Sequence, residues 1–151
     1  TSKLNAALDD RMITDTDEYM PPQEEALMIS KFLDGPIGKL SEEEFNSYRV
    51  EYITRDQKPT DKTIYNSFVA LHKITKIATE LRKTYKLTME GKAEIWNELD
   101  YVFSPRVAIY IIQDFNHTKD IEKSIKDIVL MKIADPEQKE FVNKIIEDNC
   151  K

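Results

Sequence analysis

Hydrophobic positions along the chain recur mostly at three- and four-residue steps, the spacing that places side chains on one face of an α-helix. The longest such run comprises Ile64, Phe68, Leu71, Ile74, Ala78, Leu81 and Tyr85. This run predicts a helix over about 61–86, with Pro59 breaking the chain before it and Thr60 or Asp61 capping its first turn. At about 1.5 Å per residue, the helix would be about 40 Å long, which is typical of the central helix of a bundle.

Two shorter helical patterns precede this central helix. The first begins at Pro22, where a proline suits the first helical position, and ends at the Gly35-Pro36 pair. The second follows Ser41 and Glu44, which have the spacing of a capping box, and predicts a helix over about 42–56.

Four shorter helices are predicted after the central one. Their expected N-caps are Thr88, Ser104, Asn116 or Thr118, and Asp135. The first of the four would carry Ile95, Trp96, Leu99, Val102 and Phe103 on its apolar face. Residues 106–115 are rich in β-branched side chains and also suit a buried strand. Helix is favoured there, because Ser104-Pro105 is a helix start signal and no other stretch offers a strand to pair with.

Together these patterns predict an all-α fold: a single helical bundle of about six or seven helices, with one long central helix over about 61–86 and shorter C-terminal helices. The helical domain is expected to span 22–151, since 151 residues suit one domain. Residues 1–21 are predicted to be an acidic, mobile N-terminal arm, because 9–21 lacks apolar periodicity. Trp96, Tyr101 and Tyr110 are expected in the core because they lie on periodic apolar faces, and an interface role is the alternative.

Charge is distributed unevenly around the net value of −6. Residues 1–54 hold 5 basic and 12 acidic side chains, residues 55–92 hold 9 basic and 4 acidic, and residues 93–151 hold 8 basic and 12 acidic. The middle of the chain is therefore basic between two acidic parts, which favours surfaces of opposite sign. The simpler interpretation, a solvated surface whose uneven charge has no function, is preferred, because sign clusters arise readily in a chain that is one-third charged.

Basic side chains gather on the face of the central helix opposite its apolar face. With one tyrosine, the candidate partner-binding residues of this face are Lys62, Tyr65, Lys73, Lys76 and Lys83. Tyr19 and Met20, which lie between acidic residues and a double proline, are a second candidate contact within the arm. The partner expected for the lysines is a protein with an acidic surface, or the chain's own acidic arm.

No motif in the sequence favours catalysis or a cofactor. The only histidines, His72 and His117, lie too far apart to share a metal on one helix face. The single cysteine, Cys150, lies next to the C-terminal residue, where an inert thiol is the simpler interpretation. The three glycines form no phosphate-binding loop. We therefore predict no enzyme, metal or cofactor, with a hydrolase or transferase of unseen site as the weakest alternative.

The function predicted from the sequence is a non-catalytic interaction or adaptor module that binds protein through the basic face of the long helix. The alternative is a nucleic-acid-binding or transcription-regulating domain that uses the same lysines for non-specific phosphate contacts, with 58–76 as its recognition segment. An acidic chain and an overlong recognition helix count against it. Single-cysteine usage and the absence of a long apolar run predict an intracellular protein without a membrane span.

Overall fold

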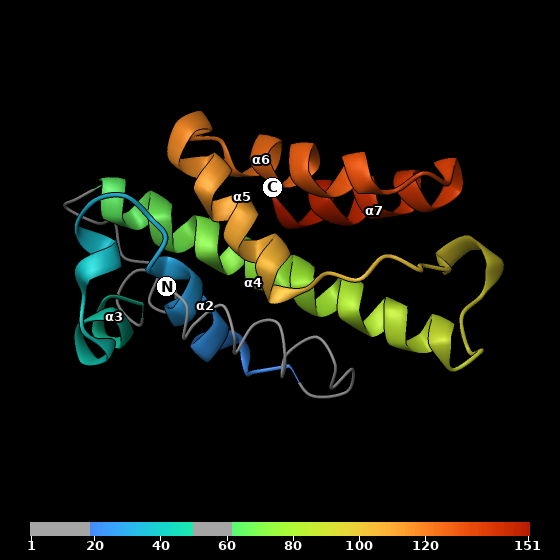
Figure 1. The fold of residues 1–151 in the computed structure, drawn as a ribbon, viewed down its shortest axis with the longest axis horizontal. Helices are drawn as coiled ribbons and strands as arrows, with labels where there is room; N and C mark the ends of the chain where they lie inside the picture. Colours follow the sequence, from blue (N-terminus) through green and yellow to red (C-terminus); the bar gives the residue numbers. More distant parts are fainter. Residues whose placement is uncertain (1–18, 50–61) are drawn as a thin grey trace.

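The computed structural model describes residues 19–49 and 62–151 of the chain, and the regular elements within these ranges are helical (Figure 1). In chain order they are α2 (Pro22–Ser30), the 3₁₀ turn η1 (Pro36–Lys39), α3 (Glu42–Arg49), α4 (Lys62–Met89), η3 (Ile95–Asn97), α5 (Pro105–Thr118), α6 (Ile121–Val129), η4 (Leu130–Lys132) and α7 (Pro136–Asn149). The prediction of an all-α bundle is confirmed. The predicted long helix is α4, which continues three residues past its expected end.

The 28 residues of α4 give it a length of about 42 Å, and the other helices pack around it. Helix α2 packs against α4 and α5, while α7 packs against α4 and α6 (Figure 1). Helices α5 and α6 form a closely packed pair. In the described residues, no helix has the length and apolar run required to cross a membrane.

A single cluster of buried apolar side chains joins these helices, and α4 contributes more residues to it than any other helix. Its fully buried members include Ile74, Ile77, Ala78 and Leu81 from α4, Ile111 and Ile112 from α5, Ile125 and Val129 from α6, and Val142 and Ile146 from α7. These positions follow the three- and four-residue steps of the sequence pattern, because one face of each helix covers the next.

Three predicted helix starts are confirmed in atomic detail. The Ser41 hydroxyl accepts from the Glu44 amide at 3.2 Å, and the Glu44 carboxylate accepts from the Ser41 amide at 3.2 Å, so the capping box is formed. Ser104 Oγ accepts from the Val107 amide at 3.4 Å at the start of α5. Asp135 caps α7 in the same way. The start expected at Thr60 or Asp61, and the second half of the helix expected over 42–56, lie outside the described residues.

The prediction of a helix that starts after Thr88 is wrong. Thr88 lies in the last turn of α4, which Gly91 ends with a φ of 71°. The Lys92 amide donates to the Leu87 carbonyl at 2.9 Å, and the Gly91 amide donates to the Thr88 carbonyl at 3.1 Å. These two hydrogen bonds around a glycine in the left-handed conformation are typical of the end of a helix. From there to Ser104 the chain is irregular apart from the short turn η3.

The prediction that Asn116 or Thr118 caps the helix observed as α6 is also wrong. Helix α5 continues through Asn116 to Thr118, and the reversal follows at Lys119, which has a φ of 56°. Asp120 is the cap of α6, since its carboxylate accepts from the Lys123 amide at 3.2 Å. Asn116 and Thr118 have the side chains of cap residues, but both belong to the last turn of α5, which also carries the buried Phe115.

The expectation that Trp96 and Tyr110 lie in the core is wrong as well. The Trp96 side chain is 71% exposed and that of Tyr110 is 49% exposed. Trp96 lies on η3 rather than on a helix packed against the core, so the periodic face inferred for it does not exist. Tyr101 is half-buried.

Candidate interaction surface

Helix α2 is fixed to α4 by a buried ion pair. The Arg82 guanidinium donates to both carboxylate oxygens of Glu25, at 2.8 and 2.7 Å. Its Nε donates to the Phe103 carbonyl at 2.9 Å, so the same side chain also holds the chain that enters α5. The Glu25 side chain is 2% exposed and that of Arg82 is 11% exposed. Arg82 therefore orients three segments around the middle of the bundle.

Tyr19 lies against this ion pair. Its ring centroid is 4.0 Å from the guanidinium carbon of Arg82, which is the distance of a cation–π contact. Burial raises the pKa of Tyr19, and the opposing effect of the nearby Arg82 charge is smaller. Both Tyr19 and Met20, the candidate contacts in the arm, are half-buried. The face of Tyr19 that stacks on Arg82 is thus occupied within the chain.

The candidate residues on α4 divide into two groups. Lys73 is half-buried, and its ammonium group donates to the Cys150 carbonyl at 3.2 Å, so it joins α4 to the C-terminal end of α7. Tyr65 is also half-buried and packs against the core. Lys62, Lys76 and Lys83 are exposed. Because Lys62 and Lys83 are 21 residues apart, these three lysines extend over about 30 Å of the helix.

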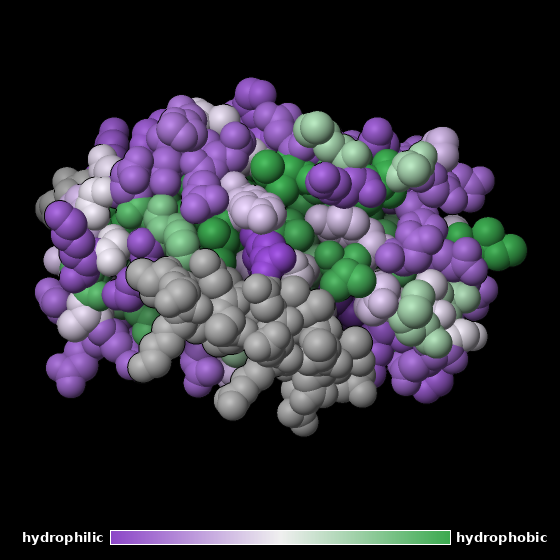
Figure 2. All heavy atoms as spheres, viewed as in Figure 1, coloured by the Kyte–Doolittle hydropathy of each residue, from purple (hydrophilic) through white to green (hydrophobic). Residues whose placement is uncertain are grey.

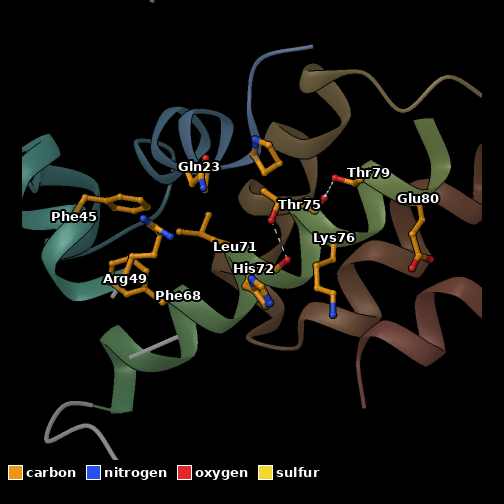
Figure 3. A pocket seen from close by; sticks show the side chains of 12 residues that line it. Gln23, Phe45, Arg49, Phe68, Leu71, His72, Thr75, Lys76, Thr79 and Glu80 are labelled. Carbon is orange, nitrogen blue, oxygen red and sulfur yellow. Dashed lines mark hydrogen bonds between the residues drawn. The ribbon is translucent and has the colours of Figure 1, made fainter. Parts of the chain in front are cut away.

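A hollow lies beside Lys76, between α2, α3 and α4 (Figure 3). We call it the α4 hollow. Its volume is about 410 Å³, and its apolar lining consists of Ala26 from α2, Phe45 from α3, and Phe68 and Leu71 from α4. The Phe45 and Phe68 rings contact each other, with centroids 4.9 Å apart and planes tilted by 44°. The apolar part of the hollow is therefore held rigidly by buried side chains.

The edge of the α4 hollow is mainly basic. Figure 3 shows Arg49 reaching from α3 toward α4, and His72 and Lys76 projecting together from α4. Among the described residues, the Nε of Arg49 is buried without a hydrogen-bond partner. The pKa of His72 is lowered, chiefly by burial and then by the Lys76 charge. Glu80 is the acidic residue of the lining, and Asn149 of α7 donates to its carboxylate at 3.2 Å.

Sequence reasoning found Lys76 but missed Arg49. A helical wheel of α4 places Lys76 on the polar face, whereas Arg49 belongs to another helix, and only the folding of α3 against α4 brings the two to one hollow. The one local signal was Phe45, whose position in the capped helix predicts that α3 packs on the core. That signal does not reveal which residue of α4 lies opposite.

The described residues contain no group of three histidine, cysteine or carboxylate side chains placed to hold a metal ion. Burial raises the pKa of the Cys150 thiol, and the smaller effect of Lys73 does not offset it. A thiol with a raised pKa holds less of the nucleophilic thiolate at neutral pH. The α4 hollow is the strongest candidate for a binding site.

No family model matches the chain, and no curated protein or solved structure matches it significantly.

Proposed function

We propose that the protein is a non-catalytic interaction module that binds an acidic protein segment in the α4 hollow. The observation that carries this proposal is the combination of an apolar interior, formed by side chains such as Phe45 and Phe68, with basic groups of Arg49 and Lys76 at its edge. A partner segment would place apolar side chains inside and carboxylates against the two basic residues. In this arrangement Lys76 contacts the partner, as expected for a residue on the basic face of α4.

The size of the hollow suits a few side chains. A volume of about 410 Å³ is within the range of about 300–1,000 Å³ that ligand sites occupy. Each apolar side chain removed from water contributes about 1.5–3 kcal/mol, while an exposed ion pair contributes at most about 1 kcal/mol. Apolar contacts would thus supply most of the affinity. The basic edge would select an acidic segment and speed its approach.

Arg49 adds specificity to this arrangement. Its buried Nε has no partner among the described residues, and a carboxylate is the acceptor that a guanidinium binds best, through two parallel bonds. A buried donor without an acceptor costs about 1–3 kcal/mol, which a bound carboxylate would recover.

The alternative function, nucleic-acid binding through the same lysines, uses less of this geometry. Phosphate contacts require exposed cations and gain nothing from an apolar interior. Lys73, one of the candidate cations, donates to a backbone carbonyl at the end of α7. The hollow therefore favours a protein partner over a nucleic acid.

A charge-reversal comparison tests the proposal. Tagged wild-type chain and the Arg49→Glu/Lys76→Glu variant are used to capture proteins from lysate. The matched control is Lys132→Glu/Lys139→Glu, which makes the same charge change at exposed positions of η4 and α7. We expect a discrete partner bound by the wild type and the control but lost from the hollow variant. Equal capture by all three chains would contradict the proposed site.

A further inference from the structure

Exposed apolar side chains are concentrated in one stretch of the described chain. Of the six large hydrophobic residues with exposed side chains in the described ranges, four lie between residues 89 and 102. They are Met89 at 56%, Ile95 at 81%, Trp96 at 71% and Val102 at 37%. Isolated exposed hydrophobic residues are normal, but a concentration of them marks an interaction surface. We call residues 89–102 the exposed segment.

The exposed segment lies just beyond the C-terminal end of α4, where the chain turns back toward α5 (Figure 1). Hydrophobic atoms coloured green are visible at this end of the molecule in Figure 2, beside hydrophilic surface. The Trp96 ring contacts the Phe141 ring edge-on, with centroids 6.3 Å apart. One edge of the indole is therefore supported by α7, while most of the ring faces outward.

The irregular backbone of the exposed segment is held in place at two positions. Leu99 is fully buried, and its amide donates to the Thr88 hydroxyl at 2.9 Å. The Asp100 amide donates to the Gln138 side chain at 3.2 Å. Binding through a segment that is already ordered costs less conformational entropy than binding through a flexible one.

The exposed segment is also acidic. Its charged residues are Glu90, Lys92, Glu94, Glu98 and Asp100, all exposed. The one lysine lies 3.9 Å from the Glu90 carboxylate. The segment thus combines apolar side chains with an excess of carboxylates. These are the groups that the apolar lining and basic edge of the α4 hollow are proposed to bind.

The two complementary surfaces cannot meet within one chain. The hollow is built on α4 around residues 68–80, and the exposed segment begins at Met89, at the far end of the same helix. From Lys76 to Met89 the continuous helix fixes an axial separation of about 20 Å. Trp96 is held against Phe141 of α7, whereas the residues that line the hollow belong to α2, α3 and α4. A contact between them has to join two molecules.

We propose that the exposed segment of one copy docks in the α4 hollow of a second copy. This inference rests on the proposed function, because it names the partner of the same hollow. Trp96 covers the apolar lining to which Phe45 and Phe68 contribute, and the carboxylates of the segment face Arg49 and Lys76. Trp and Arg are the residues most enriched at the centres of interfaces. The two paired surfaces are different, so after one contact forms, one copy still has a free hollow and the other a free exposed segment. Association can therefore continue into a ring or an open chain.

Sedimentation velocity on complementary variants tests this pairing. The segment variant is Ile95→Ala/Trp96→Ala, and the hollow variant is Arg49→Glu/Lys76→Glu. Wild type is expected to sediment faster as its concentration rises toward about 1 mM, a range that covers weak association. Each variant alone is expected to remain a monomer. An equimolar mixture of the two is expected to form a dimer and stop there, because only one intact hollow and one intact segment remain.

Distinct results separate this inference from the proposed function. A wild type that stays monomeric over the whole series overturns the inference, and so does a segment variant that associates as the wild type does. If the hollow variant has also lost a partner in the capture experiment, the proposed function stands and only the second-copy assignment fails. The Lys132→Glu/Lys139→Glu chain should associate like wild type. Since the wild-type series and the surface-exposed segment variant need no change in the hollow, a misfolded hollow variant cannot hide the result.

Discussion

The carboxylate of Glu25 and the guanidinium of Arg82 form two parallel hydrogen bonds, of 2.8 and 2.7 Å, between helices whose residues are 57 positions apart. Glu25 follows Pro22 and Gln23 on α2 and precedes Ala26, and those three residues line the α4 hollow. The ion pair therefore holds one wall of the hollow at a fixed distance from α4, and it links the stability of the bundle to the shape of the candidate site.

Removing Arg82 should destabilise the protein strongly. The Arg82→Ala variant leaves the Glu25 carboxylate buried without its cation and the Phe103 carbonyl without its donor. Breaking one side of a buried pair costs roughly 3–5 kcal/mol. Urea unfolding followed by circular dichroism measures the change in the free energy of unfolding.

A double variant identifies the cause of that loss. Glu25→Leu combined with Arg82→Met removes both charges and should recover most of the stability, because a hydrophobic pair of similar size needs no charge compensation. Lys144→Ala, at an exposed position of α7, is the control and should leave the unfolding midpoint unchanged. A double variant as unstable as Arg82→Ala would show that lost packing, rather than the unpaired charge, is responsible.

Asn116 should stabilise the connection after α2. Its side-chain amide donates to the Phe32 carbonyl at 2.9 Å, and its oxygen accepts from the Asp34 amide at 3.0 Å. Asn116→Ala leaves both backbone groups without these bonds and should cost about 1–3 kcal/mol in thermal or urea unfolding. Asn116→Asp keeps the acceptor for Asp34 but sets a carboxylate oxygen against the Phe32 carbonyl oxygen, so it should lose at least as much. An unchanged unfolding midpoint in both variants would contradict the role of these two bonds.

Gly38 should tolerate no side chain. A Cβ atom at this position would lie 2.7 Å from the Leu33 carbonyl oxygen and 3.3 Å from that of Ser30, and backbone atoms have little room to move. Gly38→Asn is expected to cost about 1–3 kcal/mol in urea unfolding. At Gly91 the Cβ would meet open space and the φ is 71°, a conformation that asparagine adopts readily. Gly91→Asn should therefore be much milder, and the reverse order would contradict the account.

Tyr101 should make the protein sensitive to alkaline pH. Burial raises its pKa from 10.0 to about 12. In the unfolded chain the phenol ionises near pH 10, while the folded state resists ionisation until about pH 12. The stability that its neutral form contributes is complete below pH 10 and is lost as the pH rises toward 12. The phenolate absorbance, recorded for wild type and Tyr101→Phe, measures the shift.

At neutral pH, Tyr101→Phe should increase the stability of the fold. Among the described residues, the Tyr101 hydroxyl is buried without a hydrogen-bond partner. Phenylalanine removes that unsatisfied group and keeps the ring, so Tyr101→Phe should stabilise the fold by about 1 kcal/mol in urea unfolding. A destabilised variant would indicate that the hydroxyl has a partner after all.

The sequence predicted those features that depend on neighbouring residues. Ser41, Ser104 and Asp135 cap their helices as their spacing indicated, because a cap needs only the next three residues. The long run of apolar positions located α4 for a similar reason. Gly91 is a local signal against the helix expected after Thr88, since a glycine in the left-handed conformation ends α4 at this position.

Features that depend on distant residues escaped prediction. Glu25 looked like an ordinary acidic residue in a first helical turn, and nothing within its own helix indicates Arg82 as its partner. The basic edge of the hollow likewise needs Arg49 and Lys76 from two helices. A helical wheel places Lys73 on the basic face of α4, but in the fold its ammonium group contacts the end of α7. Such pairings are set by tertiary packing, which periodicity does not encode.

Binding of a protein in the α4 hollow is tested by capture from lysate with and without nuclease. Tagged wild type and the Arg49→Glu/Lys76→Glu variant are each used on lysate that has been divided into nuclease-treated and untreated halves. We expect the wild type to capture a discrete protein, which can be untagged copies of this chain, in both halves of the lysate, and the variant to capture none. Recovery of nucleic acid alone, or loss of the captured protein on nuclease treatment, would contradict the account and favour phosphate binding by the lysines of α4.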